Sequence, residues 1–392
     1  MKSIYTTAEY AAYLKRVKLK PKSDKVGFIV NPVAGIGGRV GLKGSDGGEV
    51  VEKALKLGAK PVAPQRAKEF LSELKRLGVT PQLVGYDGEM GGDEAREVGF
   101  DFKALSSAKR SKTTAEDTKS AVRDCVNEGA GLIVFVGGDG TARDVLDAIK
   151  EGVPVIGVPS GVKMYSAVFA STPKGAARLI YEYMRGRVAA RLSEVLRVDE
   201  EKYRLGVLSI KLYGYLLTLS DPILLQASKM PTTVTEDELE NQKAIARRLV
   251  KEMKGDEIYI LSSGTTTKAI SDLLGLPKTL LGVDVIKKEG VIVNDANEAQ
   301  ILEAIRGKKA KIIVSPTRWQ GYIFGRGNQQ ISPEVIRTVG RSGIIVIATR
   351  RKIATLDSLR VDTGDPQLDQ QLEGFYQVIV DYNESQVIRC IA

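Results

Sequence analysis

Residues 131–152 read GLIVFVGGDGTARDVLDAIKEG, and this stretch decides the expected fold. Its first six residues form a continuous apolar run rich in β-branched side chains, typical of a strand in a parallel sheet. A glycine-rich loop follows at 137–141, and a helix with amphipathic spacing is expected to begin near Ala142. A strand, a glycine loop and a helix in direct succession predict one unit of an open α/β sheet.

The same alternation extends in both directions from this stretch. Further runs that predict strands lie at 26–30, 81–86 and 154–160. Segments with helical spacing lie between and after them, at 50–57, 67–78, 114–129 and 176–186. Strands that alternate with helices imply parallel pairing with right-handed crossovers. The N-terminal half is therefore expected to be a Rossmann-like α/β domain with a parallel sheet.

The C-terminal half predicts a second domain of mixed α+β structure. It is expected to begin with antiparallel strands at 204–210 and 211–220, followed by a charged helix at 236–255 and, at the end of the chain, a hairpin at 375–391. A chain of 392 residues is too long for one compact core. We expect two domains, 1–192 and 193–392.

Composition excludes several kinds of chemistry. The sequence contains no histidine, so a general base must be a carboxylate, Lys, Tyr or Cys. The two cysteines, Cys125 and Cys390, provide neither a disulfide framework nor a thiolate cluster for zinc. No apolar run reaches the roughly 18 residues that span a bilayer, and residues 1–20 lack the apolar stretch of a signal peptide. We expect a cytoplasmic protein without a membrane partner.

The net charge of +10 favours anionic ligands. Nucleic acid is one such ligand and a nucleotide is another, but the chain has no helix-turn-helix, aromatic RNA platform or zinc finger pattern. The basic residues are spread along the chain, so excess lysine on a solvated surface is the alternative explanation. We expect small-molecule anions rather than nucleic acid as partners.

A glycine-rich segment directly follows the predicted strand at 26–30. Residues 31–41 read NPVAGIGGRVG, and their four glycines permit positive φ angles and a close approach of backbone N–H groups to an anion. The spacing matches neither the dinucleotide fingerprint nor the P-loop. A tight strand-to-helix turn is the alternative, although a second glycine group around Asp46, GSDGG at 44–48, argues against a mere turn.

The loop at 137–141, Gly-Gly-Asp-Gly-Thr, is the more specific signal. Bare N–H groups and the dipole of the following helix favour a phosphate there. Asp139 would repel that phosphate unless a metal ion or a reacting hydroxyl lies between them. Phosphoryl transfer needs such an acid, because the acceptor hydroxyl must be oriented and deprotonated near the γ-phosphate. The alternative is an Asp-Gly turn with Thr141 as the helix N-cap.

Three segments in this order and spacing resemble the ATP-NAD kinase superfamily, which also takes in diacylglycerol and sphingosine kinases. They are NPVAGIGG at 31–38, VGGDGTARD at 136–144 and GVPSGVKMYSAVFA at 157–170. Its archaeal and bacterial branch is suggested by GLKGSDGG (41–48), TLLGVDVI (279–286), FGRGNQQISPEVI (324–336) and LRVDTGD (359–365). The resemblance covers nearly the whole chain, but GGDGT specifies phosphoryl transfer better than it specifies the acceptor.

The resemblance implies an ATP-dependent kinase that phosphorylates the 2′-hydroxyl of NAD to give NADP. Asp139 would be the catalytic residue that orients and deprotonates this hydroxyl. Glu194 follows Ser193 where the family has an Asn-Glu or Asn-Asp pair, and Lys163 would neutralise a phosphate unless it is a surface lysine. The nucleotide and phosphate site would then be lined by Asn31, Gly35, Gly37, Gly38, Asp46, Gly137, Gly138, Gly140, Thr141, Gly161, Lys163 and Glu194.

Magnesium is expected to accompany ATP, held mainly by the phosphates, because Mg²⁺ rarely receives an all-protein cage. One carboxylate of the protein could assist the phosphates, and which residue holds the metal is left open. Relatives often form dimers or tetramers, so we expect a homo-oligomer. The sequence does not show whether ATP or polyphosphate is the phosphoryl donor, or whether NADH is accepted as well as NAD.

Two segments depart from the pattern of the branch and leave the acceptor open. Arg318-Trp319 precedes Gln320-Gly321 where small residues are usual, and SSGTTT at 262–267 has serines in place of a Gly-Pro-Gly-like turn. Trp319 could stack on a base, exclude NAD, or pack in a domain interface. The alternatives are a kinase of a polyol or sugar, a nucleotide-binding protein without catalysis, and, if affinity proves strongly salt-dependent, a nucleic-acid binder.

Overall fold

The computed structural model describes residues 17–18, 23–42, 48–107, 113–149, 152–161, 164–198, 209–220, 235–317 and 320–392. These residues form two compact units. The first unit takes its residues from Met1–Ile36, Lys60–Asp199 and Ser209–Met230. The second takes them from Gly37–Ala59, Glu200–Leu208 and Pro231–Ala392.

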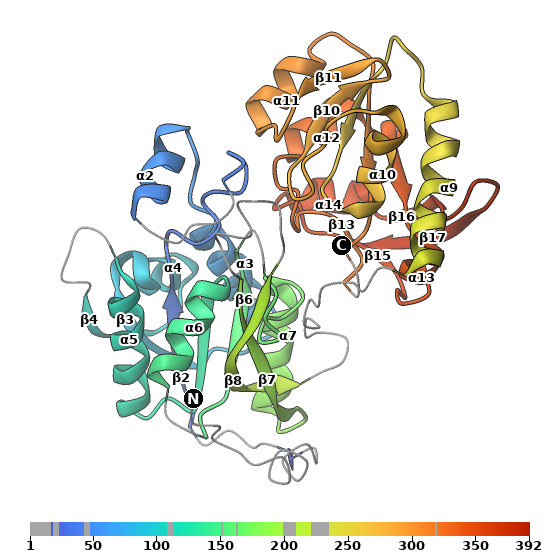
Figure 1. Cartoon of the computed structure of the whole chain (residues 1–392). Coiled ribbons are helices and arrows are strands. Elements are labelled where there is room, and N and C mark those ends of the chain that lie inside the picture. Colours follow the sequence, from blue (N-terminus) through green and yellow to red (C-terminus); the bar gives the residue numbers. More distant parts are fainter. Residues whose placement is uncertain are drawn as a thin grey trace. The chain divides into compact units, whose positions relative to one another are not determined.

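An eight-stranded sheet forms the centre of the first unit, with the strand order β1-β7-β8-β6-β5-β2-β3-β4 (Figure 1). Five strands run parallel in its larger part: β2 (Lys25–Val30), β3 (Gln82–Asp87), β4 (Phe102–Ser107), β5 (Leu132–Gly137) and β6 (Val155–Pro159). The remaining strands are β1 (Val17–Lys18), β7 (Ala189–Val198) and β8 (Ile210–Ser220). β7 is antiparallel to both β1 and β8.

Helices cover both faces of this sheet. One face packs against α3 (Ala63–Arg76) and α7 (Pro173–Met184), and the other against α5 (Ala115–Asn127) and α6 (Asp139–Ala148). The 3-10 helix η1 (Gly88–Met90) and α4 (Gly92–Val98) follow β3. Residues of β5 are buried throughout, which explains why its sequence is an uninterrupted apolar run. Each fully buried Leu, Val or Phe side chain of this core contributes about 1.5–3 kcal/mol.

The end of the first unit differs from the predicted domain boundary. The division expected between residues 192 and 193 falls inside β7, and β7 pairs with β8 along its length. The predicted strand at 211–220 is therefore part of the first sheet, because the backbone groups of β7 need a partner strand. Residues 204–208 of the other predicted strand lie outside the described residues.

The second unit contains a nine-stranded sheet with the order β11-β10-β9-β12-β14-β16-β17-β15-β13. Its central strands β9, β12, β14 and β16 are parallel, and β10–β11 and β16–β17 are antiparallel pairs. The strands are β9 (Ile258–Leu261), β10 (Asp284–Lys287), β11 (Gly290–Val293), β12 (Ala310–Val314), β13 (Tyr322–Phe324), β14 (Ile344–Ile347), β15 (Leu359–Val361), β16 (Gly374–Ile379) and β17 (Ser385–Ile391). The hairpin predicted at the end of the chain is confirmed.

Two hydrophobic cores lie against this second sheet. α9 (Glu236–Glu252) and α10 (Thr265–Leu274) contribute to one, and α11 (Glu298–Ile305), α12 (Pro333–Val339) and α14 (Pro366–Leu372) to the other. The shorter elements are α2 (Gly48–Lys56), η2 (Arg341–Gly343) and α13 (Arg350–Ile353). The predicted fold class is confirmed: a parallel-sheet α/β domain is followed by a domain of mixed α and β structure. Among the described residues, no helix has both the length and the apolar character needed to cross a bilayer.

Candidate active site

The strand order of the first sheet changes direction between β2 and β5. The chain moves from β2 outward to β3 and β4, then returns to β5 on the other side of β2 and continues to β6. In open α/β sheets, ligands bind outside the carboxyl ends of the strands at such a point. Both glycine loops that the sequence singled out leave the sheet here, one after β2 and one after β5.

Asn31 and Thr141 join these two loops. The side-chain amide of Asn31 donates to Thr141 Oγ1 at 2.9 Å, and the main-chain N–H of Asn31 donates to Val136 O at 3.0 Å. Thr141 is buried and Gly138 occupies the N-cap position, so the alternative of a turn capped by Thr141 is wrong. The helix begins at Asp139 rather than near Ala142, which puts this acid in its first turn, where the helix dipole favours negative charge.

Two glycines allow the main chains of the loops to touch. A Cβ atom at Gly35, where φ is +80°, would lie 2.0 Å from Ser160 O at the end of β6. A Cβ atom at Gly161 would lie 2.9 Å from the Cα atom of Gly138. The loops after β2, β5 and β6 can therefore form a site lined by main-chain amides, which suits an anion such as phosphate.

Asp139 accepts two main-chain hydrogen bonds from the segment after β6. Tyr165 N donates to Oδ2 at 2.7 Å, and Ser166 N donates to Oδ1 at 3.1 Å. Burial raises the pKa of Asp139 from 3.8 to about 6, although these hydrogen bonds and the charge of Arg143 act in the opposite direction. A carboxyl group with a pKa near neutrality is suited to take up and release a proton at physiological pH.

The remaining predicted residues fall into three groups. Gly140 lies in the first turn of α6, and Glu194 lies on β7, where its main-chain oxygen accepts from Ala167 N at 2.9 Å. Gly37 and Gly38 belong to the second unit, in a turn where Leu42 N donates to Gly37 O at 3.0 Å. Asp46, Lys163, Arg318 and Trp319 lie outside the described residues.

Two serines near the site were missed by the sequence analysis. Ser160 is 6% exposed, and its hydroxyl has no hydrogen-bond partner among the described residues. Buried hydroxyls are normally hydrogen-bonded, so this one fits a polar ligand at the end of β6. Ser166 is fully buried and binds Asp139. A serine after a strand is too common for its spacing to have indicated either role.

Magnesium fits this site only if bound phosphates supply most of its ligands. Within the described part of the chain, no three Asp, Glu or Cys side chains gather to hold a metal ion. The amides and hydroxyls at the ends of β2, β5 and β6 suit phosphate oxygens, and Asp139 adds one carboxylate. This donor set agrees with the preference of Mg²⁺ for phosphates and one or two carboxylates.

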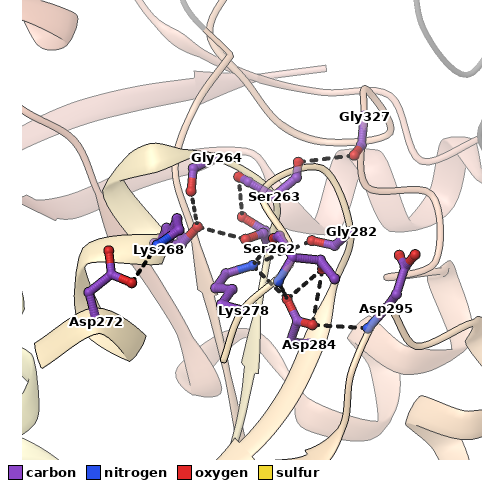
Figure 2. Close-up of polar contacts among 12 residues, drawn as sticks. Ser262, Ser263, Gly264, Lys268, Asp272, Lys278, Gly282, Asp284, Asp295 and Gly327 are labelled. Atoms are coloured by element: carbon purple, nitrogen blue, oxygen red, sulfur yellow. Dashed lines mark hydrogen bonds and ion pairs between the residues drawn. The ribbon is translucent and has the colours of Figure 1, made fainter. Parts of the chain in front are cut away.

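A second strand–loop–helix element lies in the other unit, where Ser262, Ser263 and Gly264 join β9 to α10 (Figure 2). The hydroxyl of Thr267 donates to Ser262 O at 2.7 Å, and that of Ser263 donates to Gly327 O at 3.1 Å. Nearby, Lys278 and Asp284 form an ion pair at 2.8 Å with both side chains fully buried. The loop carries no acid, and these two hydroxyls bind main-chain oxygens of the protein itself.

Comparisons with known proteins match two separate ranges of the chain. The family model described as the ATP-NAD kinase N-terminal domain matches residues 26–188, and the one described as the ATP-NAD kinase C-terminal domain matches residues 240–390. No curated protein and no solved structure matches the chain. The first match contains Asn31, Asp139 and Gly161, whereas Glu194 lies between the two matched ranges.

Proposed function

This chain belongs to the ATP-NAD kinase family, and we propose that it transfers the γ-phosphoryl group of ATP to the 2′-hydroxyl of NAD, giving NADP. Membership makes it a phosphotransferase with a hydroxyl acceptor. The choice of NAD as that acceptor is the proposal. The matches to both ATP-NAD kinase domains support NAD as the acceptor. Phosphoryl transfer itself is supported most directly by Asp139, which lies at the start of α6 with a pKa near 6 and accepts two main-chain hydrogen bonds.

Asp139 would act on the acceptor side of the reaction. The 2′-oxygen of NAD attacks the γ-phosphorus, the bond to the oxygen bridging the β- and γ-phosphates breaks, and ADP leaves. Asp139 accepts a hydrogen bond from the 2′-hydroxyl and takes its proton as the new bond forms. At pH 7 the carboxyl group is mostly ionised and can accept this proton, because its pKa is about 6.

The loops would act on the donor side. The first N–H groups of α6 and the buried hydroxyl of Ser160 would bind phosphate oxygens. Asn31 would hold the two loops together through its hydrogen bond to Thr141. Gly138 and Gly161 lie close together, and the lack of side chains at both would leave their main chain open to the phosphates. Bound Mg²⁺ would supply positive charge that offsets the charge of the phosphates.

An assay for NADP tests the proposal directly. Purified protein is given ATP, Mg²⁺ and NAD, and NADP is measured with an NADP-specific dehydrogenase, beside the Asp139→Asn variant. We expect wild type to form NADP, and the variant to lose about 100- to 10,000-fold in kcat with little change in nucleotide affinity. An Asn variant as active as wild type would reject the role of Asp139.

A polyol or sugar acceptor is the second candidate. It is supported by the segment 262–267, whose serines depart from the turn usual in the branch. A screen for ADP release with NAD, NADH, polyols and sugars separates the two candidates, and polyphosphate in place of ATP tests the donor. ADP release with a polyol and none with NAD would reject NAD as the acceptor in favour of the polyol.

Sedimentation velocity would test the expected homo-oligomer.

A further inference from the structure

The segment at 164–170 turns back along β6 and carries the groups that bind Asp139. Gly157 N donates to Val168 O, and Ala170 N donates to Gly157 O, both at 2.9 Å. Phe169 packs where a side chain on Gly157 would stand: a Cβ atom there would lie 2.5 Å from the Phe169 ring. The same ring meets Phe135 of β5 edge-to-face at 5.5 Å. These contacts fix the segment on the sheet, and so fix the position of Ser166.

Ser166 joins Asp139 to β7. Its main-chain N–H donates to Asp139 Oδ1 at 3.1 Å, and its side chain lowers the pKa of the same carboxyl group. Its Oγ accepts from Leu196 N of β7 at 2.9 Å. The side chain of Ser166 is thereby anchored to β7 while its main-chain N–H binds the carboxylate. The residue is fully buried, so water does not compete for either contact.

We propose that Ser166 is a positioning residue: it fixes the orientation of the Asp139 carboxylate and stabilises the ionised form that accepts the proton. The inference rests on the role proposed above for Asp139. A hydrogen bond to the charged form of an acid favours that form, while burial favours the neutral form. Ser166 thus limits how far burial can suppress the ionisation of the catalytic acid.

Other charged groups near this end of α6 do not replace Ser166. Arg143, one turn along the helix, also lowers the pKa of Asp139 through its charge, but this effect is smaller than those of Ser166 and Tyr165. Lys119 of α5 and Tyr213 of β8 bind Asp147, two turns further along α6.

The test is a titration of the Asp139 carboxyl carbon by ¹³C NMR, in protein labelled at aspartate and assigned through the signal missing from Asp139→Asn. We expect a midpoint near pH 6 in wild type. In Ser166→Ala the midpoint should rise by about one pH unit, a tenfold change in proton affinity. Ser166→Thr keeps the hydroxyl and should titrate close to wild type. The acidic limb of the kcat/KM profile should move with the midpoint.

Ser271→Ala is the matched control, since Ser271 is also a fully buried serine and its hydroxyl has no hydrogen-bond partner among the described residues. Its midpoint should equal that of wild type. An unchanged midpoint in folded Ser166→Ala would overturn the inference, whatever the activity. If the midpoint moves but wild type makes no NADP, the proposed function fails and the positioning role stands, because the titration needs neither ATP nor acceptor.

Discussion

The two units contain the same backbone arrangement with different chemistry. In each, a buried parallel strand ends in a short loop, and a helix begins directly after it: β5 and α6 in one, β9 and α10 in the other. The first loop places Asp139 among glycines and receives contacts from residues far away in sequence. The second has hydroxyl side chains that bind their own loop and its neighbour (Figure 2). The backbone alone therefore does not identify the catalytic loop.

The carboxylates Asp139 and Asp284 show this difference more sharply. Asp284 is paired with Lys278 and also accepts from Thr279 and from Asp295 N at 2.9 Å. Asp139 is held by main-chain amides and a serine, and its pKa rises to about 6. Removing one partner of a buried ion pair destabilises a fold, whereas the raised pKa of Asp139 lets it exchange a proton near neutral pH. This contrast leads to four predictions.

The largest effect separates the two acids by activity. Asp139→Asn should lower kcat about 100- to 10,000-fold, because the base is lost while the shape of the side chain is kept. Asp284→Asn should leave kcat per folded molecule within about threefold of wild type, since Asp284 lies in the other unit and touches no proposed site residue. Steady-state kinetics, with the active fraction determined by nucleotide titration, checks both. Equal losses of kcat in the two variants would contradict a catalytic role for Asp139 that Asp284 does not share.

The next effect concerns stability. Asp284→Ala should lower the free energy of unfolding by about 3–5 kcal/mol, because it leaves the charge of Lys278 buried without its partner. Urea unfolding followed by circular dichroism measures the loss. The double variant Lys278→Met, Asp284→Leu removes both charges and should recover most of it. A double variant as unstable as Asp284→Ala would show that the pair contributes more than its charge.

A smaller effect is the pH dependence of stability. The pKa of Asp139 is raised from 3.8 to about 6, so the native state binds its proton more tightly than the unfolded chain does. Its contribution to stability is complete below pH 4 and is lost as the pH rises through 6. Between pH 4 and pH 7.5, wild type should therefore lose about 2 kcal/mol relative to Asp139→Asn. Urea unfolding of both proteins at the two pH values measures the difference, and a constant difference would contradict the raised pKa.

The smallest effect is expected in the second loop. Ser263→Ala removes the hydrogen bond to Gly327 O and should cost about 1 kcal/mol of unfolding free energy. Thermal unfolding gives the value, with Ser271→Ala as the control for a serine that has no such bond among the described residues. A loss several times larger would mean that Gly327 and its loop depend on Ser263 for their position.

The sequence was most informative where one local pattern was sufficient. β5 and the terminal hairpin were predicted because a fully buried strand and two alternating strands around a turn have distinct patterns. β4 and β7 were missed. Half-exposed strands such as β4 lack a continuous apolar run, and β7 has charged residues among its apolar ones. Both strands are held in the sheet by hydrogen bonds to neighbouring strands, and the local sequence does not show which strands will be neighbours.

The sequence by itself determined the chemistry available to this protein: no histidine, an acid among glycines, and loops that permit a phosphate. Tertiary structure decided which groups control that acid. Ser166 is 27 residues from Asp139 along the chain, and Asn31 is 110 residues from Thr141, yet each pair is in hydrogen-bond contact. The physical reason is that parallel strands joined by helices bring their carboxyl ends to one edge of the sheet. Residue types can be read locally, but proton affinity depends on burial and partners, which only the assembled sheet provides.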